Sequence, residues 1–300
     1  MRFIIMAPEY TESSGGVMVL HKLCHLLNSC GEKSYMHPMM DNYFKYQLKR
    51  LRHKITLRKT KYRTNLAFNT PVLSELTADD LENSIIIYPE TVAGNPLRAK
   101  NIVRWFLHHP GYQSGNVNYN SGEIYFSFGA FGRDFKLWGS KTSNITLRVT
   151  HMLREHYNED NPINKRHGTA YCLRKGKGRE IVHDLSDSIF IDNKSHSEIA
   201  KIFKEVEYFI SYDLYTIYTK YAIMCGCIPI VIPDDNLSFE QWLPLKEHRL
   251  GIAYGFDMIN QAKSEKERAL SVIDKSEIDS INNVYKFIVE VKAFFKKINL

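Results

Sequence analysis

The sequence has few cysteines and no long apolar run. Its five cysteines among 300 residues are an odd number spread along the chain, which does not suit the disulfide framework of a small secreted protein. No stretch approaches the ~18 apolar residues of a membrane-spanning helix, and the apolar run at residues 1–7 is too short for a signal peptide. We therefore expect a cytoplasmic protein in a reducing compartment.

The sequence also lacks the glycine motifs of two large nucleotide-binding classes. It contains neither G-x-G-x-x-G nor G-x-x-x-x-G-K-[ST], which argues against dinucleotide oxidoreductases and P-loop NTPases. His21, Cys24 and His25 fall on one helix face without a second cluster of ligands, and residues 225–227 form C-x-C rather than the redox motif C-x-x-C. We interpret these side chains as packing residues and expect neither a metal nor a cofactor.

Positive charge is concentrated in the first half of the chain. The 40 Lys and Arg exceed the 33 Asp and Glu by seven, and the whole excess lies before residue 145. Residues 45–63 hold nine basic and no acidic side chains, which suits an anionic membrane surface or phosphorylated acceptor, a nucleic acid, or a solvated face. Leucines and isoleucines spaced along this run favour an amphipathic segment on a membrane. No nucleic-acid-binding motif accompanies it, so we expect no nucleic-acid partner.

Short β-rich runs fill the first half of the chain. These runs are Arg2–Ala7, Ser84–Tyr88, Ile102–Leu107, Ile124–Phe128 and Ile145–Val149. After Gly15-Gly16, apolar residues recur on one helix face as far as Ser29, and Gly31 is a plausible stop. Strands that alternate with helices predict an α/β protein whose parallel sheets are covered on both faces.

The second half repeats this alternation. Its strand-like runs are Thr169–Leu173, Ser188–Asp192, Tyr208–Ser211 and Ile228–Pro233. Ser195 and Glu198 form a capping box ahead of a helix over 199–206, and a further helix is predicted over 215–224. The polar segment 156–167 is the best linker, so we expect domains 1–155 and 156–300 with a cleft between them. The last helix, 281–298, has one apolar face and should pack on a domain surface.

Polar loops that follow strands of the second half are candidate ligand sites, because ligands of open parallel sheets bind beyond the carboxyl ends of the strands. The loop Arg174–Arg179 combines glycines with cations and suits an anion such as diphosphate, although a basic surface turn has the same pattern. Asp213 and Thr216 follow another strand. They are interpreted either as helix caps or as contacts for a ribose and a phosphate.

The first half offers a second group of candidates. Gly15-Gly16 opens its first helix, and His108 and His109 end a strand. Each histidine is a candidate for proton transfer or for a hydrogen bond to a substrate hydroxyl, with a core or solvent-facing histidine as the alternative. Glu90 follows the strand Ser84–Tyr88 and is a candidate for acceptor binding or base catalysis, or an ordinary loop residue.

These elements together resemble glycosyltransferases of the GT-B architecture. The segment Ser188–Pro233 is similar to the nucleotide-sugar-binding half of the retaining enzymes, especially the families of bacterial surface-polysaccharide synthesis. The resemblance implies two Rossmann-like parallel-sheet domains facing a cleft, with the acceptor held by domain 1–155 and the donor by domain 156–300. It also implies metal-independent chemistry, which agrees with the absence of Asp-x-Asp from the sequence.

The resemblance and the positions of polar residues at strand ends and helix starts together assign roles to individual residues. Those expected to bind the donor are Gly15, Gly16, Arg174, Asp192, Tyr212, Asp213, Thr216 and Tyr221. Those expected to act in catalysis are Lys175, Lys177, His109, His108 and Glu90. The family has two glutamates eight positions apart, which fall here on Asp213 and Tyr221, so the second carboxylate is missing.

The resulting hypothesis is transfer of a sugar from a nucleoside-diphosphate sugar to a glycan or lipid-linked glycan, with retention of configuration. The basic run would hold the enzyme at the inner membrane face, without a membrane-spanning segment. The alternatives are a nucleotide-sugar epimerase of the same architecture, a non-catalytic nucleic-acid binder that uses residues 45–63, and a structural pseudoenzyme.

Overall fold

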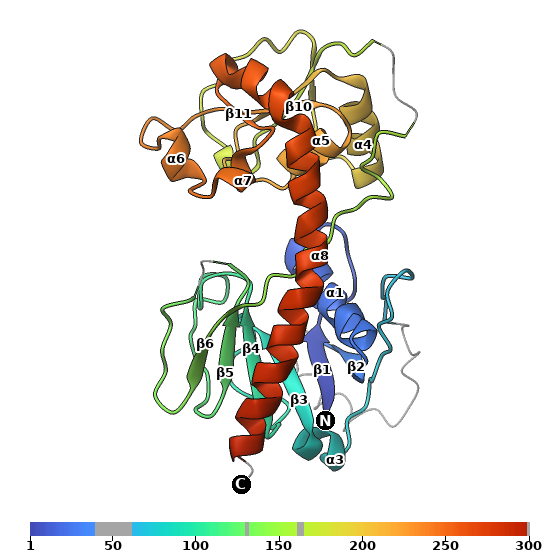
Figure 1. The fold of residues 1–300 in the computed structure, drawn as a ribbon, viewed down its shortest axis with the longest axis vertical. Coiled ribbons are helices and arrows are strands. Elements are labelled where there is room, and N and C mark those ends of the chain that lie inside the picture. The colour runs from blue at the N-terminus through green and yellow to red at the C-terminus, as the bar shows by residue number, and fades with distance from the viewer. Residues whose placement is uncertain (40–61, 130–131, 161–164, 299–300) are drawn as a thin grey trace, which may run out of the picture. The chain divides into compact units, whose positions relative to one another are not determined.

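The structure, a computed structural model, describes residues 1–39, 62–129, 132–160 and 165–298 (Figure 1). The basic run 45–63 therefore lies outside the described residues, except for its last two. The chain forms two compact units: unit 1 comprises Met1–His151 and Ile278–Leu300, and unit 2 comprises Met152–Glu277. The sequence had suggested a boundary after residue 155. In the structure the boundary follows His151, and the C-terminal segment returns to unit 1.

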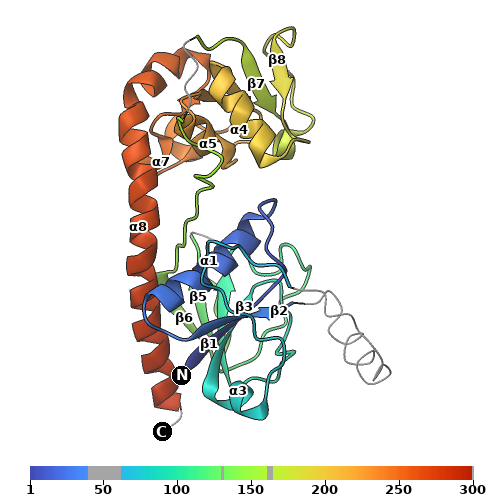
Figure 2. The same cartoon turned by 90° about the vertical axis from the view of Figure 1, so that its right-hand side faces the viewer.

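Unit 1 contains a six-stranded parallel sheet in the order β2-β1-β3-β4-β5-β6 (Figure 1). Figure 2 shows the same sheet after a quarter turn. Its strands are β1 (Arg2–Ala7), β2 (Ser34–Pro38), β3 (Ser84–Pro89), β4 (Asn101–Phe106), β5 (Ile124–Ser127) and β6 (Lys141–Thr146). Its helices are α1 (Gly15–Ser29), α3 (Ala78–Asn83) and the C-terminal part of α8 (Ile259–Ile298).

Both faces of this sheet are covered, as predicted. Side chains that alternate along the strands, such as Phe3 and Ile5, pack with α1 and with Val284, Phe287 and Val291 of α8. The opposite set of strand side chains packs against residues of the segment that links β3 to β4. The prediction that the last helix packs on a domain surface is confirmed.

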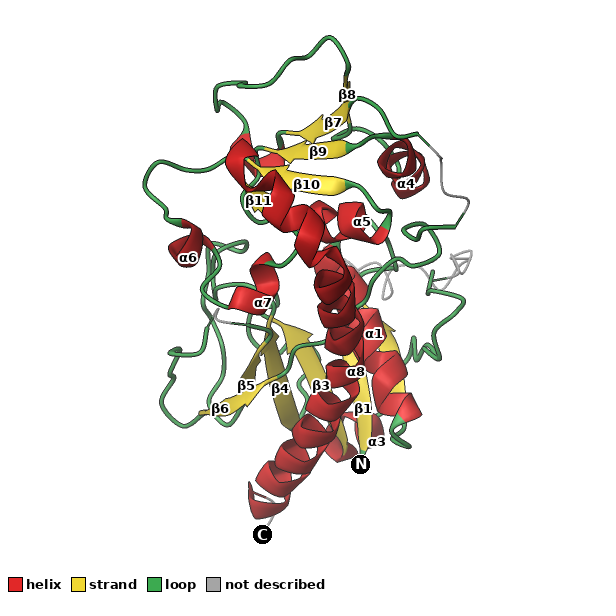
Figure 3. Cartoon of the chain, turned by 45° about the horizontal axis from the view of Figure 1, so that its top comes forward, coloured by secondary structure: helices red, strands yellow, loops and turns green. Residues whose placement is uncertain are grey.

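Unit 2 contains a five-stranded parallel sheet in the order β11-β10-β9-β7-β8 (Figure 3). Its strands are β7 (Thr169–Cys172), β8 (Ser188–Phe190), β9 (Tyr208–Ser211), β10 (Ile228–Val231) and β11 (Ala253–Tyr254). Its helices are α4 (His196–Glu205), α5 (Tyr218–Met224), α6 (Phe239–Trp242), α7 (Lys246–Arg249), the first part of α8, and the 3₁₀ turns η1 (Arg174–Gly176) and η2 (Phe256–Met258).

Helix boundaries follow the capping chemistry where the sequence provides it. The predicted capping box of Ser195 and Glu198 is present, and because Ser195 is the N-cap, α4 spans His196–Glu205 rather than the predicted 199–206. The expected start of the next helix at residue 215 is wrong, because residues 213–216 form a turn and α5 begins at Tyr218. The last helix begins at Ile259 rather than at 281, because its first half is too polar to show a continuous apolar face.

None of the helices that the structure describes combines the length and the apolar character needed to cross a bilayer.

Candidate functional site

The basic loop of unit 2 lies directly beyond the carboxyl end of β7. Gly176 is buried, and a Cβ atom built at this position would lie 2.1 Å from the carbonyl oxygen of Tyr212, the residue that follows β9. Only glycine allows this approach of two backbone segments. We had expected the loop glycines to admit a ligand, but Gly176 instead serves to pack the loop on the neighbouring strand.

Arg179 fixes the other end of the loop to the same sheet edge. Its guanidinium donates hydrogen bonds to the carbonyl oxygens of Tyr212 at 2.9 Å and Ile232 at 3.1 Å, and also to that of Pro233. These acceptors follow β9 and β10, so one cation fastens the loop to two strand ends. From the sequence we expected Arg179 to be one of the cations that face an anion, and its contacts to the strand ends were not predicted. Its three acceptors lie 33 to 54 residues away along the chain.

Arg174 is held by residues from two other elements. Its backbone has φ +43°, a left-handed conformation that is uncommon outside glycine. Its backbone N–H donates to Oδ2 of Asp192, which follows β8, at 2.8 Å. Its guanidinium lies over the ring of Tyr218, with Cζ 4.4 Å from the centroid, and donates to the Tyr218 hydroxyl at 3.2 Å. Arg174 and Asp192, both predicted donor contacts, are therefore brought together.

Lys175 and Lys177 are exposed, and neither makes a hydrogen bond or ion pair with the residues that the structure describes. The backbone that carries them is fixed on both sides, by Asp192 and by Arg179. The two ammonium groups therefore add uncompensated positive charge to a rigid loop at the carboxyl edge of the sheet. Preorganised cations of this kind suit an anionic ligand.

Asp213 and Thr216 shape the turn between β9 and α5. Asp213 is buried, and its carboxylate accepts a hydrogen bond from the Tyr215 N–H at 3.0 Å. Thr216 Oγ1 accepts a hydrogen bond from the Tyr218 N–H at 3.3 Å. The N-cap of α5 is Ile217, whose side chain makes no capping hydrogen bond. Neither residue is thus the N-cap that we considered, and both polar groups stabilise the turn.

Tyr212 and Tyr221 are fully buried, which does not favour the donor contacts expected of them. The Tyr212 hydroxyl accepts from the Val182 N–H at 2.9 Å and lies 2.8 Å from Nδ1 of His183. The Tyr221 ring stacks on Tyr157 with centroids 4.0 Å apart and planes 2° from parallel. The position of the missing second glutamate is therefore part of an aromatic core.

In unit 1 the expected residues gather at the carboxyl ends of β1, β3 and β4. Gly16 lies in the first turn of α1, and a Cβ built there would be 3.5 Å from Leu107, which follows β4. Glu90 follows β3, is buried, and accepts from the Leu107 N–H at 3.0 Å. Burial raises the pKa of the Glu90 carboxyl, and its hydrogen bonds from backbone N–H groups oppose this shift. Glu90 thus joins two strand ends.

His108 and His109 differ in their surroundings. His108 is half-buried and stacks on Tyr112, with ring centroids 4.1 Å apart, whereas His109 is exposed. The backbone N–H of His109 donates to Nδ1 of His108 at 2.8 Å. Because an N–H can only donate, this contact requires a lone pair on Nδ1, and the neutral ring then carries its proton on Nε2. In this state His108 offers a hydrogen-bond donor.

A buried ion pair behind Glu90 was not predicted. Arg104 of β4 and Glu123 are both fully buried and are joined by two hydrogen bonds of 2.7 and 2.8 Å. The guanidinium also donates to the Gly94 carbonyl at 2.9 Å and lies 4.0 Å from the ring of Tyr119, whose hydroxyl donates to the Glu90 carbonyl. A charged residue inside an apolar strand was the only sequence signal for this network.

The helix α1 histidines and cysteine that we discounted as metal ligands have structural contacts. Nε2 of His21 lies 2.9 Å from the Pro8 carbonyl oxygen, and Nδ1 of His25 accepts from the Asn69 N–H. Cys24 is buried and accepts from the Ser34 hydroxyl. Two of these contacts fix the segments that follow β1 and precede α3.

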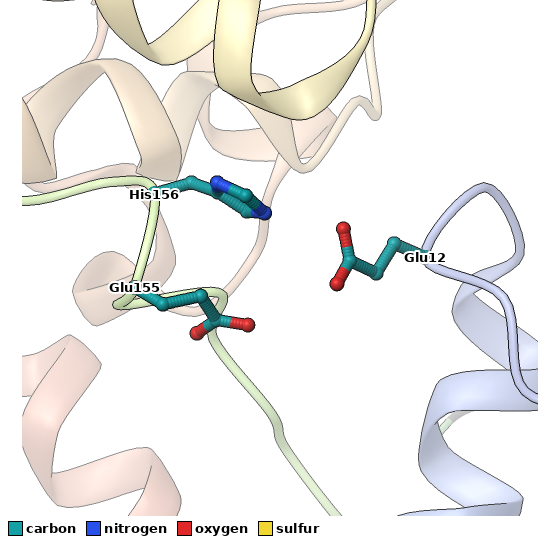
Figure 4. A group of neighbouring side chains, drawn as sticks. All are labelled: Glu12, Glu155 and His156. Atoms are coloured by element: carbon teal, nitrogen blue, oxygen red, sulfur yellow. The ribbon is translucent and has the colours of Figure 1, made fainter. Parts of the chain in front are cut away.

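Figure 4 labels three further polar side chains, which belong to different units. Glu155 and His156 follow one another at the start of unit 2, and Glu12 comes from the loop before α1 of unit 1. The His156 ring lies over that of His196 of α4, with centroids 6.3 Å apart.

Comparisons with known proteins inform the fold. No protein-family model matches the chain, and none of the curated proteins does. A glycosyltransferase from Rickettsia africae ESF-5 aligns with a TM-score of 0.54 and 10% identity, over 98% of this chain and 99% of that chain. A sucrose-phosphate synthase from Thermosynechococcus elongatus aligns with a TM-score of 0.46 and 9% identity, over 99% of this chain and 100% of that one. The predicted fold class, two units that each contain a parallel α/β sheet, is confirmed, and the chain shares its fold with the Rickettsia africae glycosyltransferase.

Proposed function

We propose that the protein is a glycosyltransferase that moves a sugar from a nucleoside-diphosphate sugar to a glycan or lipid-linked glycan. The donor diphosphate binds at the basic loop of unit 2, and the acceptor binds at the carboxyl edge of the unit 1 sheet. The observation that carries the proposal is the pair of exposed, uncompensated lysines, Lys175 and Lys177, on a loop fixed to three strand ends. The fold shared with a glycosyltransferase supports it.

The chemistry of the loop follows from charge. Breaking the bond between the sugar and the diphosphate leaves negative charge on the departing phosphate oxygens. Lys175, Lys177 and Arg174 neutralise this charge without reorganisation, because the loop backbone is already fixed. Loss of one such contact lowers the rate by about 10²-fold, or about 2.7 kcal/mol. The proposal includes metal-independent transfer and retention of configuration.

Unit 1 contributes groups for an acceptor hydroxyl. His108 presents an N–H donor in its neutral form, which can orient a sugar oxygen. The exposed His109 is the candidate to exchange a proton with the acceptor. Glu90 is buried and engaged by backbone N–H groups, so in this proposal it holds the histidine segment and does not act as a base.

Thermal shift with UDP, GDP, CDP and CMP is the first test. A ligand that binds only the folded state adds about 2.7 kcal/mol to the free energy of unfolding when its concentration is about 100 times its dissociation constant. We expect at least one nucleoside diphosphate to raise Tm, and Lys175→Ala or Lys177→Ala to reduce that shift. Lys201→Ala, an exposed lysine on α4, is the matched control and should behave like the wild type. Wild-type transfer and donor hydrolysis in both loop variants would reject the proposal.

The same assays separate the alternatives. Conversion of the donor sugar to its epimer without any acceptor would identify an epimerase. Tight, salt-sensitive binding to DNA or RNA with no response to nucleoside diphosphates would identify a nucleic-acid binder. Peripheral contact with an anionic membrane through residues 45–63 is also part of the proposal.

A further inference from the structure

Arg174 has a conformation that its own side chain does not favour. Among the residues that the structure describes, Arg174 and Arg98 are the two non-glycine residues with positive φ, at 43° and 56°. A side chain in this region costs free energy that glycine avoids, and such strain persists where the surroundings over-determine it. The surroundings of Arg174 do so, because its backbone N–H and that of Leu173 both donate to Oδ2 of Asp192, at 2.8 and 3.2 Å.

The guanidinium of Arg174 is held as firmly as its backbone. Tyr218 covers one face of the guanidinium at 4.4 Å and accepts a hydrogen bond from it at 3.2 Å. Asp192 Oδ1 lies 3.9 Å from Nε, which is a long ion pair. The Arg174 side chain still keeps 39% of its area exposed, so part of the cation remains open to a ligand.

Tyr218 is itself fixed from behind by aromatic rings. Its ring stacks on His196 with centroids 5.8 Å apart and meets Tyr221 edge-on at 5.8 Å. The Tyr157 hydroxyl lies 2.7 Å from Nδ1 of His196, and Tyr157 stacks on Tyr221 at 4.0 Å. Three rings from three segments of unit 2 thus set the position of Tyr218, and Tyr221 has a role that needs no carboxylate.

We infer that Tyr218 and Asp192 are positioning residues for the binding of the donor diphosphate, because they hold Arg174 in place beside Lys175. This inference rests on the proposed function, because it concerns the same ligand. Asp192 holds the strained backbone, and Tyr218 orients the guanidinium so that its open part faces the anion that the loop lysines attract. The arrangement gives a reason for an arginine at a position where glycine would be less strained.

The inference is tested with inorganic pyrophosphate as the probe, by calorimetry at low salt on the full chain. Tyr218→Leu should weaken pyrophosphate binding about tenfold, the change that a contact of about 1.4 kcal/mol gives. Tyr218→Phe keeps the ring and should restore part of the affinity. Arg174→Gly should show the same tenfold loss with an unchanged or higher Tm, because glycine accepts the left-handed backbone.

Tyr208→Leu is the matched control. Tyr208 also lies near a cation, Lys263, at 5.6 Å, but it stands at the amino end of β9, so pyrophosphate binding should stay at the wild-type level. The NMR chemical shift of the Arg174 side chain provides a second measurement, which reports directly on whether the Tyr218 ring covers the guanidinium. The Arg174 Nε–H resonance, assigned by its loss in Arg174→Lys, should be shifted upfield by the Tyr218 ring and should lose this shift in Tyr218→Leu.

The outcomes distinguish the inference from the proposed function. Wild-type pyrophosphate binding in Tyr218→Leu and Arg174→Gly, together with a loss in Lys175→Ala, would overturn the inference and leave the function standing. Absence of pyrophosphate binding by the wild type, or wild-type binding in both Lys175→Ala and Lys177→Ala, would overturn both. If Tyr218→Leu does not fold, Tyr218→Phe and Arg174→Gly carry the same test.

Discussion

Replacing Glu123 with glutamine tests how strongly unit 1 depends on its buried ion pair. Arg104 and Glu123 are fully buried, at 0% and 1% side-chain exposure, so water cannot solvate a charge left without its partner. In Glu123→Gln the carboxylate becomes a neutral amide, whose NH₂ group faces a guanidinium N–H. The Arg104 charge then remains inside the protein with only neutral acceptors, such as the Gly94 carbonyl.

The magnitude follows from the two hydrogen bonds of 2.7 and 2.8 Å that join the charges. A hydrogen bond to a charged group contributes a net ~1.5–3 kcal/mol, and removal of one partner of a buried pair costs about 3–5 kcal/mol. Since a domain is stable by only about 5–15 kcal/mol, this is a large fraction. At about 2–4 °C per kcal/mol for a unit of this size, we expect the Tm of unit 1 to fall by roughly 10 °C.

Circular dichroism melts and urea unfolding measure this change. The exposed pair Lys100–Glu82, at 47% and 57% side-chain exposure, provides the control, and Glu82→Gln should cost less than about 1 kcal/mol. The double variant Arg104→Met/Glu123→Leu should recover much of the loss, because it leaves no buried charge. If Glu123→Gln costs no more than Glu82→Gln, the reasoning about an uncompensated buried charge is refuted.

Three further predictions concern other parts of the chain. In Gly176→Ala the new Cβ would lie 2.1 Å from the Tyr212 carbonyl oxygen, so we expect a lower Tm and weaker nucleoside-diphosphate binding; wild-type values of both in thermal-shift assays would contradict this. Burial lowers the pKa of His21 below its usual 6.5, so the unfolded state binds more protons and stability should fall as the pH drops from 7.5 to 5.5. The fall in Tm should be smaller in His21→Gln, and equal falls would contradict the assignment. Finally, in a flotation assay at low salt the protein should rise with anionic liposomes, and neutralising the basic residues of 49–63 should abolish this flotation. Wild-type protein that remains in the bottom fraction would count against membrane contact.

Much of the strand framework could be predicted because apolar runs in this chain have clear ends. The first strand was predicted at Arg2–Ala7 and has these bounds, since Pro8 ends it. The strand Tyr208–Ser211 also has its predicted bounds. The loops that follow these strands could then be named as candidate sites from the sequence alone. In a parallel sheet the carboxyl ends of all strands lie at one edge, and ligands bind at that edge.

The roles of individual side chains at these edges could not be predicted in the same way. Arg179 and Arg104 both bind carbonyl oxygens that only the folded chain brings near them. The resemblance to GT-B enzymes placed Tyr221 at a donor-binding position, but it does not show that the ring points into an aromatic core. A sequence specifies which element a residue belongs to more directly than it specifies which neighbour its side chain meets.

The division of α8 between the two units makes unit 1 discontinuous in the sequence. Phe287 near the end of the chain packs against Phe3 and Phe126, with ring centroids 6.1 and 4.8 Å apart. The core of unit 1 is therefore built from two stretches of chain that are separated in sequence by the whole of unit 2, and residues 1–151 alone lack the α8 side chains that complete it. Unit 2, in contrast, is formed by the single continuous segment Met152–Glu277, so a truncation within 278–298 would remove core side chains of unit 1 and leave the segment of unit 2 intact.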